Sequence, residues 1–346
     1  MARAGSPRTR GQQQGGGERV WINDVVMRDG LPMEPVFVPT SEKVALIDEI
    51  GHCGLNRIEA TSFTSAKAIP ALSDAEAVMH EIERVPGVRY AALVLNRRGA
   101  ERALECGVDE LNLVVSANET HNLANTRMTR AQAVRALLDI TAFCRDRLAI
   151  GVSIATAFGC PMEGAIDIDS VLDIGNQFVA AGVRGITLCD TTGMANPRQV
   201  KAVCGALAAR WPGIELTLHL HNTRGMGLAN VVAGLDAGIR HFDASLGGLG
   251  GCPFAPGASG NICTEDLVHM LDAMGYATGV DLERLIACAR RMPGLVGHGV
   301  PGQVQHAGAW DHRFPPPADL EATRERALAR ELSGDAYRAM RPVVER

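Results

Sequence analysis

The sequence has 346 residues, of which 46% are hydrophobic and 21% charged, and its formal net charge at pH 7 is −5. This balance is typical of a globular protein with a large core; the negative charge, the 4% aromatic content and the lack of a basic stripe argue against nucleic acid as a partner. No hydrophobic run reaches the ~18 residues that a membrane span needs, so we expect no membrane partner.

Residues 1–17 contain no acidic residue and almost no apolar one, so we expect a disordered tail, and the stretch has no hydrophobic region of the kind a secretory signal carries. The nine cysteines are scattered without any Cys-x-x-Cys pair. An odd number of unpaired cysteines indicates free thiols in a reducing compartment, and we expect a cytoplasmic protein.

From residue 18 onward, short apolar runs alternate with segments of helical period. The predicted strands are 20–27, 57–62, 89–95, 110–116, 149–155, 185–190, 215–221 and 241–246. The predicted helices are 40–53, 74–84, 97–106, 129–147, 169–181, 196–210, 226–238 and 264–274. Near-continuous apolar strands that alternate with helices indicate a parallel sheet, and eight such units predict a (β/α)8 TIM barrel over residues 18–295.

A short C-terminal helical extension, residues 296–346, follows the predicted barrel. Pro315, Pro316 and Pro317 interrupt the chain, and residues 318–332 have the composition of a charged helix with an Ala/Leu stripe. This helix either packs on the barrel or on a neighbouring subunit, or it is a solvated helix.

Polar residues gather where the predicted strands end, which in a TIM barrel is the face that carries the chemistry. His219 and His221 stand two residues apart on one strand, so both imidazoles project from the same face. Asp29 follows the first strand, which lies next to the eighth in a closed barrel and therefore within reach of the seventh. An open metal site for Mg²⁺, Mn²⁺, Co²⁺ or Zn²⁺ is one interpretation of these three residues, and satisfied core histidines are the other.

The glycine-rich segment 247–261 is too long for a simple turn and has the composition of a lid or substrate clamp. Within it, Asn261 is either a further metal ligand, whose amide oxygen would favour Mg²⁺ or Mn²⁺, or a turn residue. Cys252 is either a proton donor, since a thiol near a cation titrates closer to neutrality, or an inert loop cysteine.

Arg28 cannot bind a metal because a guanidinium has no acceptor, but it suits a carbonyl or enolate oxygen on which charge develops. Glu59, at the end of the second predicted strand, either orients Arg28, carries a proton, or is a plain ion-pair partner.

These residues resemble the 3-hydroxy-3-methylglutaryl-CoA lyase family of metal-dependent TIM-barrel lyases. The resemblance covers about residues 20–290, and its most specific part is the Cys-bearing loop. Its motifs are Arg-Asp-Gly-Leu at 28–31, Ile-Glu-Ala-Thr-Ser-Phe at 58–63, Phe-Gly-Cys-Pro-Met-Glu-Gly at 158–164, Cys-Asp-Thr-Thr-Gly at 189–193, His-Leu-His-Asn-Thr at 219–223, and residues 248–261 followed by Thr-Glu-Asp-Leu at 264–267.

The resemblance implies a divalent-metal enzyme, with Mg²⁺ or Mn²⁺ as the expected ion, that acts on an acyl-CoA thioester and forms a homodimer. By this resemblance the metal ligands are Asp29, His219, His221 and Asn261. Arg28 steadies the enolate oxygen, Cys252 protonates the departing acetyl-CoA carbanion, and Glu59 and Asp190 lie inside the site. The implied reaction is retro-Claisen cleavage of hydroxymethylglutaryl-CoA to acetyl-CoA and a keto acid such as acetoacetate, a step of leucine degradation and ketone-body formation.

The chain departs from the family at one motif, where Arg-Asp-Gly-Leu is followed by Pro32, Met33 and Glu34 instead of Gln-Asn-Glu. Two amides are replaced by groups that offer no N–H, so we expect unchanged metal binding and altered substrate choice. Citramalyl-CoA or a longer-chain 3-hydroxyacyl-CoA is therefore an alternative substrate. A Claisen-condensing acyltransferase of the isopropylmalate synthase type and a non-catalytic barrel are the other two hypotheses.

Overall fold

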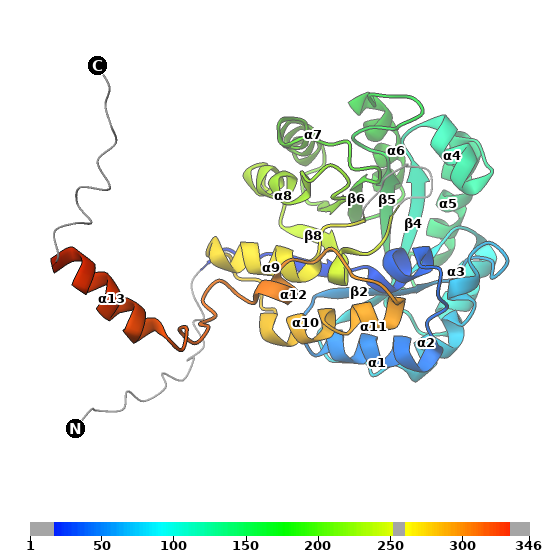
Figure 1. The fold of residues 1–346 in the computed structure, drawn as a ribbon. Helices are drawn as coiled ribbons and strands as arrows, with labels where there is room; N and C mark the ends of the chain where they lie inside the picture. The colour runs from blue at the N-terminus through cyan, green and yellow to red at the C-terminus, as the bar shows by residue number, and fades with distance from the viewer. Residues whose placement is uncertain (1–16, 252–259, 333–346) are drawn as a thin grey trace, which may run out of the picture. The chain divides into compact units, whose positions relative to one another are not determined.

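A computed structural model describes residues 17–251 and 260–332 of the chain. Parallel strands close into a barrel in chain order, and the last strand pairs with the first (Figure 1). Each strand lies within its predicted range: β1 (Trp21–Asp24), β2 (Arg57–Ser62), β3 (Arg89–Val94), β4 (Glu110–Ser116), β5 (Ala149–Ala155), β6 (Gly185–Asp190), β7 (Glu215–Leu220) and β8 (His241–Ala244). The prediction of a TIM barrel is confirmed.

Eight helices match the predicted ones: α1 (Thr40–Gly51), α2 (Ala75–Glu81), α3 (Arg97–Glu105), α5 (Arg130–Cys144), α6 (Ile168–Ala180), α7 (Pro197–Arg210), α8 (Gly227–Asp236) and α9 (Thr264–Ala273). Four further helices are α4 (Glu119–Thr126), α10 (Leu282–Ala289), α11 (Met292–Val296) and α12 (Val304–Ala307). Short helical turns are η1 (Val26–Gly30), η2 (Leu31–Met33), η3 (Pro70–Leu72) and η4 (Leu246–Gly248). Helix α4 has no hydrophobic stripe, because the residues that it buries are His121 and Asn122.

The hydrophobic core lies between the strands and the surrounding helices. Outward-facing strand residues such as Ile58, Leu111, Ile186 and Phe242 are fully buried there. The inside of the barrel is polar instead, whereas branched aliphatic side chains fill most TIM barrels. A hydrogen bond from Asn112 on β4 to Glu59 on β2 crosses this interior, since β3 separates the two strands in the wall.

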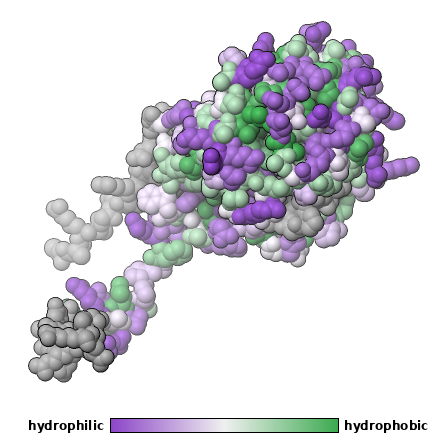
Figure 2. All heavy atoms as spheres, turned by 90° about the horizontal axis from the view of Figure 1, so that it is seen from above, coloured by the Kyte–Doolittle hydropathy of each residue, from purple (hydrophilic) through white to green (hydrophobic). Residues whose placement is uncertain are grey.

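The chain forms two compact units, one up to Ala309 and one from Trp310 onward. The second unit contains α13 (Leu320–Leu332), where the sequence predicts a charged helix. The predicted domain boundary at residue 295 stays a prediction, and residues 1–16 of the predicted tail lie outside the described part of the chain. Figure 2 shows a largely hydrophilic surface with small hydrophobic areas between the polar ones. Within the described ranges, no helix combines the length and the hydrophobicity that crossing a membrane requires.

Gly175 and Gly205 provide a matched test of helix packing. On Gly175, in α6, an added Cβ would lie 2.1 Å from a ring carbon of Trp211, whose indole follows α7 and is 4% exposed. On Gly205, in α7, an added Cβ would meet no atom within 4 Å. We expect Gly175→Ala to lower the free energy of unfolding by about 1–3 kcal/mol through overpacking, and Gly205→Ala to raise it by about 0.5–1 kcal/mol. Urea unfolding measures both values, and equal effects at the two sites would contradict this account of the α6–Trp211 contact.

Glu265, in the first turn of α9, predicts a pH dependence of stability. Its carboxylate is fully buried and accepts a 3.0 Å hydrogen bond from the Gly247 N–H, and burial raises its pKa from 4.5 to about 8. The folded protein therefore binds a proton on Glu265 more tightly than the unfolded chain does. The free energy of unfolding falls as the pH rises from about 4.5 to about 8. We expect Glu265→Gln to raise the melting temperature more at about pH 9 than at about pH 5. Calorimetry at both pH values, with the exposed Glu81→Gln as control, measures the difference, and a pH-independent effect would refute it.

Candidate active site

The two predicted histidines and Asp29 meet at the carboxyl-terminal mouth of the barrel. His219 is on β7, and His221 follows the strand and bridges to Asn261. The Nε2 atoms of the histidines are 3.2 Å apart, and they lie 3.7 and 3.8 Å from Oδ2 of Asp29. One potential ligand atom from each of these three residues lies within 4.8 Å of the others, which is close enough for one metal ion to bind all three.

The structure corrects the placement of Arg28 and Asp29. The predicted strand over 20–27 would place them directly at its end, but β1 ends at Asp24 and both residues are on the π-helical turn η1. Oδ1 of Asp24 accepts a 2.8 Å hydrogen bond from the Val26 N–H, which competes with continued strand pairing and turns the chain. The turn aims Asp29 toward β7.

The protonation states in this cluster fit a divalent cation. Burial alone would raise the pKa of Asp29, but the charges of Arg28 and both imidazoles outweigh it and hold that pKa at about 2. Burial, followed by the charge of His219, lowers the pKa of His221 to about 3, so its ring is neutral. Burial alone would lower the pKa of His219, but the hydrogen bond to Asp243 and the charge of Asp29 outweigh it and raise that pKa. A cation that binds both facing Nε2 atoms takes the place of a proton on His219, and two imidazole nitrogens beside a carboxylate suit a divalent metal.

Asn261 belongs to the same cluster. Its Nδ2 donates to Oδ2 of Asp29 at 2.8 Å and to the carbonyl of Leu249 at 3.0 Å. Its Oδ1 is buried and has no hydrogen-bond partner among the described residues. An unpaired buried amide oxygen next to a carboxylate suits a cation, because such an oxygen is otherwise costly to bury.

Arg28 and Glu59 form one rigid unit beside the cluster. Nε and Nη2 of Arg28 lie 2.9 and 2.8 Å from Oε2 of Glu59, and Nη1 contacts Asp29. Oε1 of Glu59 accepts from Nδ2 of Asn112 at 2.8 Å, and Asn112 in turn accepts from Ser153 Oγ at 2.8 Å. Because both oxygens of Glu59 are engaged, the geometry favours the interpretation in which Glu59 orients Arg28 over the one in which it carries a proton.

Asp190 is at the end of β6, beside β7. Its Oδ1 accepts from the backbone N–H groups of Met194 and Ala195 at 2.8 and 3.0 Å and so closes the loop before α7. Its Oδ2 is buried and has no partner within the described residues, and burial raises its pKa to about 6. One carboxylate oxygen of Asp190 therefore stabilises the loop, and the other is available to accept or donate a proton.

Cys252 lies outside the described residues, but both ends of its loop are placed against the cluster. Gly250 adopts φ +104°, and an added Cβ would lie 2.7 Å from the carbonyl oxygen of Asp29 and 2.5 Å from Nδ2 of Asn261. On Gly260, an added Cβ would lie 2.1 Å from the carbonyl oxygen of Gly248. Glycine is required at both positions because any side chain would collide with backbone.

Asp243 is a site residue that is not among those predicted from the sequence. Its Oδ2 is 3.3 Å from Nδ1 of His219, and its Oδ1 accepts from Nδ2 of Asn23 at 2.9 Å. Burial alone would raise the pKa of Asp243, but the hydrogen bond and charge of His219 outweigh it and lower that pKa. The alternation of inward and outward side chains along a strand could have identified it. Asp243 has an inward position in the predicted strand 241–246, next to the strand that carries His219.

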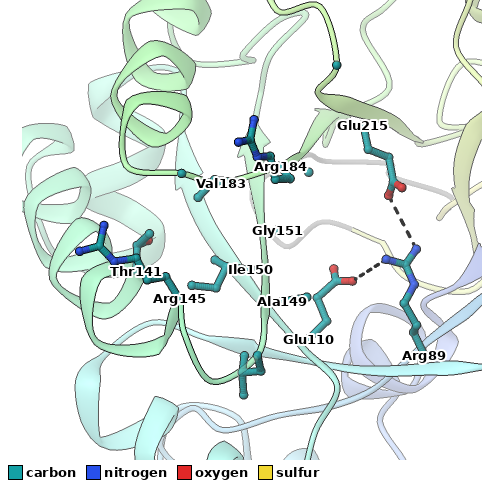
Figure 3. A pocket seen from close by; sticks show the side chains of 14 residues that line it. Arg89, Glu110, Thr141, Arg145, Ala149, Ile150, Gly151, Val183, Arg184 and Glu215 are labelled. Carbon is teal, nitrogen blue, oxygen red and sulfur yellow. Dashed lines mark hydrogen bonds and ion pairs between the residues drawn. The ribbon is translucent and has the colours of Figure 1, made fainter.

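A pocket of about 480 Å³ opens at the opposite, amino-terminal mouth of the barrel (Figure 3). The paired glycines Gly151 and Gly185 leave room on its floor. Its carboxylates already have ion-pair partners, since Glu110 and Glu215 lie 3.2 and 3.7 Å from Arg89. The residues predicted to do chemistry are at the other mouth, so this pocket is separate from the candidate active site.

Comparisons with known proteins agree with the motifs. Residues 19–292 match the family model described as HMGL-like. A hydroxymethylglutaryl-CoA lyase of Bacillus subtilis is 43% identical over 287 residues, which are 83% of this chain and 96% of that protein. An (R)-citramalyl-CoA lyase of Chloroflexus aurantiacus is 41% identical over 305 residues, 84% of this chain and 95% of that protein. The structure of an HMG-CoA lyase from A. baumannii, in complex with coenzyme A and 3-methylmalate, has a TM-score of 0.84 and 48% identity, covering 86% of this chain and 98% of that one. The chain therefore belongs to the HMGL-like family.

Proposed function

We propose that this protein is a divalent-metal-dependent lyase that cleaves hydroxymethylglutaryl-CoA, or a close 3-hydroxyacyl-CoA analogue, to acetyl-CoA and a keto acid. The observation that carries the proposal is the juxtaposition of Arg28 with the cluster of Asp29, His219 and His221. The hydroxymethylglutaryl-CoA and citramalyl-CoA lyases among its relatives, both more than 40% identical over most of their length, support cleavage over condensation.

The metal would be held by Asp29, His219, His221 and Asn261. A bound divalent cation supplies positive charge that lowers the pKa of a substrate hydroxyl and neutralises a substrate carboxylate. One carboxylate and one amide oxygen among the four ligands favour Mg²⁺ or Mn²⁺, which prefer oxygen donors.

The remaining residues fit the two halves of a retro-Claisen cleavage. Loss of the tertiary hydroxyl proton lets the bond between C2 and C3 break, which leaves a carbonyl at C3 and negative charge on the acetyl-CoA fragment. Arg28, held by Glu59, is placed to stabilise that charge through N–H donation. The free Oδ2 of Asp190, with a pKa of about 6, suits proton transfer near neutral pH. Cys252 is the proposed donor of the proton that completes acetyl-CoA.

We further propose a cytoplasmic homodimer. The eight cysteines of the described residues are all free and buried, as expected of a protein in a reducing compartment. Homodimerisation rests on the family resemblance.

Release of acetyl-CoA tests the function. We expect the purified chain, stripped of metal and supplied with Mg²⁺ or Mn²⁺, to release acetyl-CoA from hydroxymethylglutaryl-CoA or citramalyl-CoA, and to lose this activity with EDTA. Arg28→Gln should keep metal binding, because none of the four ligands changes, and lose about 10²–10³-fold in kcat, because it removes the cation that stabilises the developing charge.

Arg145→Gln, at the opposite mouth, is the matched control and should leave kcat unchanged. Release of free CoA from acetyl-CoA and a 2-oxo acid, with no cleavage of any thioester, would identify a condensing acyltransferase instead. An inactive protein in every assay would support the non-catalytic barrel.

Substrate choice is predicted to depend on Pro32 and Met33. The segment after Asp29 presents an exposed apolar rim, with Met33 41%, Val36 44% and Phe37 50% exposed. We expect the double variant Pro32→Gln/Met33→Asn to shift the ratio of kcat/KM values by about tenfold toward substrates with smaller or more polar groups at C3. Enzymes discriminate by about this factor between substrates that differ by one methylene. Competition assays with paired thioesters measure the ratio. Met274→Asn, an equally exposed position beyond α9, is the control, and an unchanged ratio in the double variant would refute the prediction.

A further inference from the structure

Asp243 lies beneath the candidate metal ligands, in the middle of β8, and only 2% of its surface is exposed. Both of its oxygens are engaged by side chains that come from neighbouring strands. Oδ1 accepts from Nδ2 of Asn23 at 2.9 Å, and Oδ2 is 3.3 Å from Nδ1 of His219. The carboxylate is therefore held on one side by β1 and aimed on the other side at a ring on β7.

This contact decides which nitrogen of His219 carries the proton. A carboxylate accepts hydrogen bonds, so in the neutral ring of His219 Nδ1 is the N–H donor and Nε2 keeps its lone pair. Nε2 is the atom that faces Asp29 and His221, at 3.7 and 3.2 Å. Protonation at the remote nitrogen thus leaves the near nitrogen available to a cation.

His221, unlike His219, has no carboxylate that orients its ring. Its Nδ1 is buried and has no hydrogen-bond partner among the described residues. The two histidines therefore differ: a fixed carboxylate sets the tautomer and ring orientation of His219, whereas the tautomer of His221 has no such determinant. Removing a carboxylate that orients a ligating histidine weakens metal binding because the ring must then be ordered by the metal itself.

We propose that Asp243 is a positioning residue that holds His219 in the tautomer and orientation needed to bind the divalent cation. The inference rests on the proposed metal site, and it assigns to Asp243 no contact with substrate. Its role is distinct from that of Glu59, which orients Arg28 on the other side of the cluster.

Mn²⁺ binding to the full chain, stripped of metal, tests the proposal without any enzymatic reaction. We expect Asp243→Ala to raise the Mn²⁺ dissociation constant, measured by electron paramagnetic resonance of the free ion, about 10–100-fold. Asp243→Asn keeps the size of the side chain and should weaken binding less. Addition of saturating Mn²⁺ should restore most of kcat in both variants, since the reacting groups are unchanged.

Glu110→Gln is the matched control. Glu110 is a buried carboxylate on β4 at the opposite mouth of the barrel, where it forms ion pairs with Arg57 and Arg89. We expect Glu110→Gln to change thermal stability without changing the Mn²⁺ dissociation constant.

The outcomes separate the inference from the function on which it rests. Wild-type affinity for Mn²⁺ in both Asp243 variants, while the unchanged protein binds Mn²⁺ tightly, would overturn the positioning role and leave the metal site intact. Failure of the unchanged protein itself to bind Mn²⁺ would overturn the metal site and with it the proposed function. If Asp243→Ala does not fold, Asp243→Asn carries the test, with the melting temperature of the metal-free protein reported for each variant.

Discussion

The barrel interior tolerates no isolated charge, and the active face is organised around that constraint. A buried carboxylate or guanidinium is stable only where a partner neutralises it or donates to it. Arg28 neutralises Asp29, and Glu59 holds Arg28 from below. Asn112 then donates to Glu59 from across the barrel. Arg28 and His219 are therefore each held by a deeper carboxylate, that of Glu59 or of Asp243, and their orientation is determined from beneath.

The same constraint explains why the interior departs from the aliphatic packing of most TIM barrels. A hydrophobic layer under the ligands would leave the remote nitrogen of His219 and Oε1 of Glu59 without partners. The remote nitrogen of His221 has no partner among the described residues even now. Polar side chains remove that penalty and also limit the number of orientations that each functional group adopts. Hydrophobic stabilisation then comes from the layer between the strands and the helices.

Alternation of apolar and polar segments sufficed to predict the barrel, because every strand carries an outward apolar row that helices must cover. It did not predict α4, whose buried residues His121 and Asn122 are polar, nor the helices α10, α11 and α12. The strand that was expected to carry Arg28 and Asp29 ends earlier, since the side chain of Asp24 binds the backbone of Val26. Local side-chain hydrogen bonds of this kind leave no periodic signal.

Residue types and their spacing already determine much about this protein: eight strand–helix units, two histidines on one face of a strand, and a glycine-rich loop bearing Cys252 and Asn261. Each of these features involves residues close together in the sequence, so it can be predicted from the sequence alone. Tertiary structure alone decided which groups meet. Asn261 reaches Asp29 across 232 residues, and Asp243 reaches His219 across 24. Such contacts depend on barrel closure and on the register between strands, which set the distance between two side chains only after the whole sheet has formed.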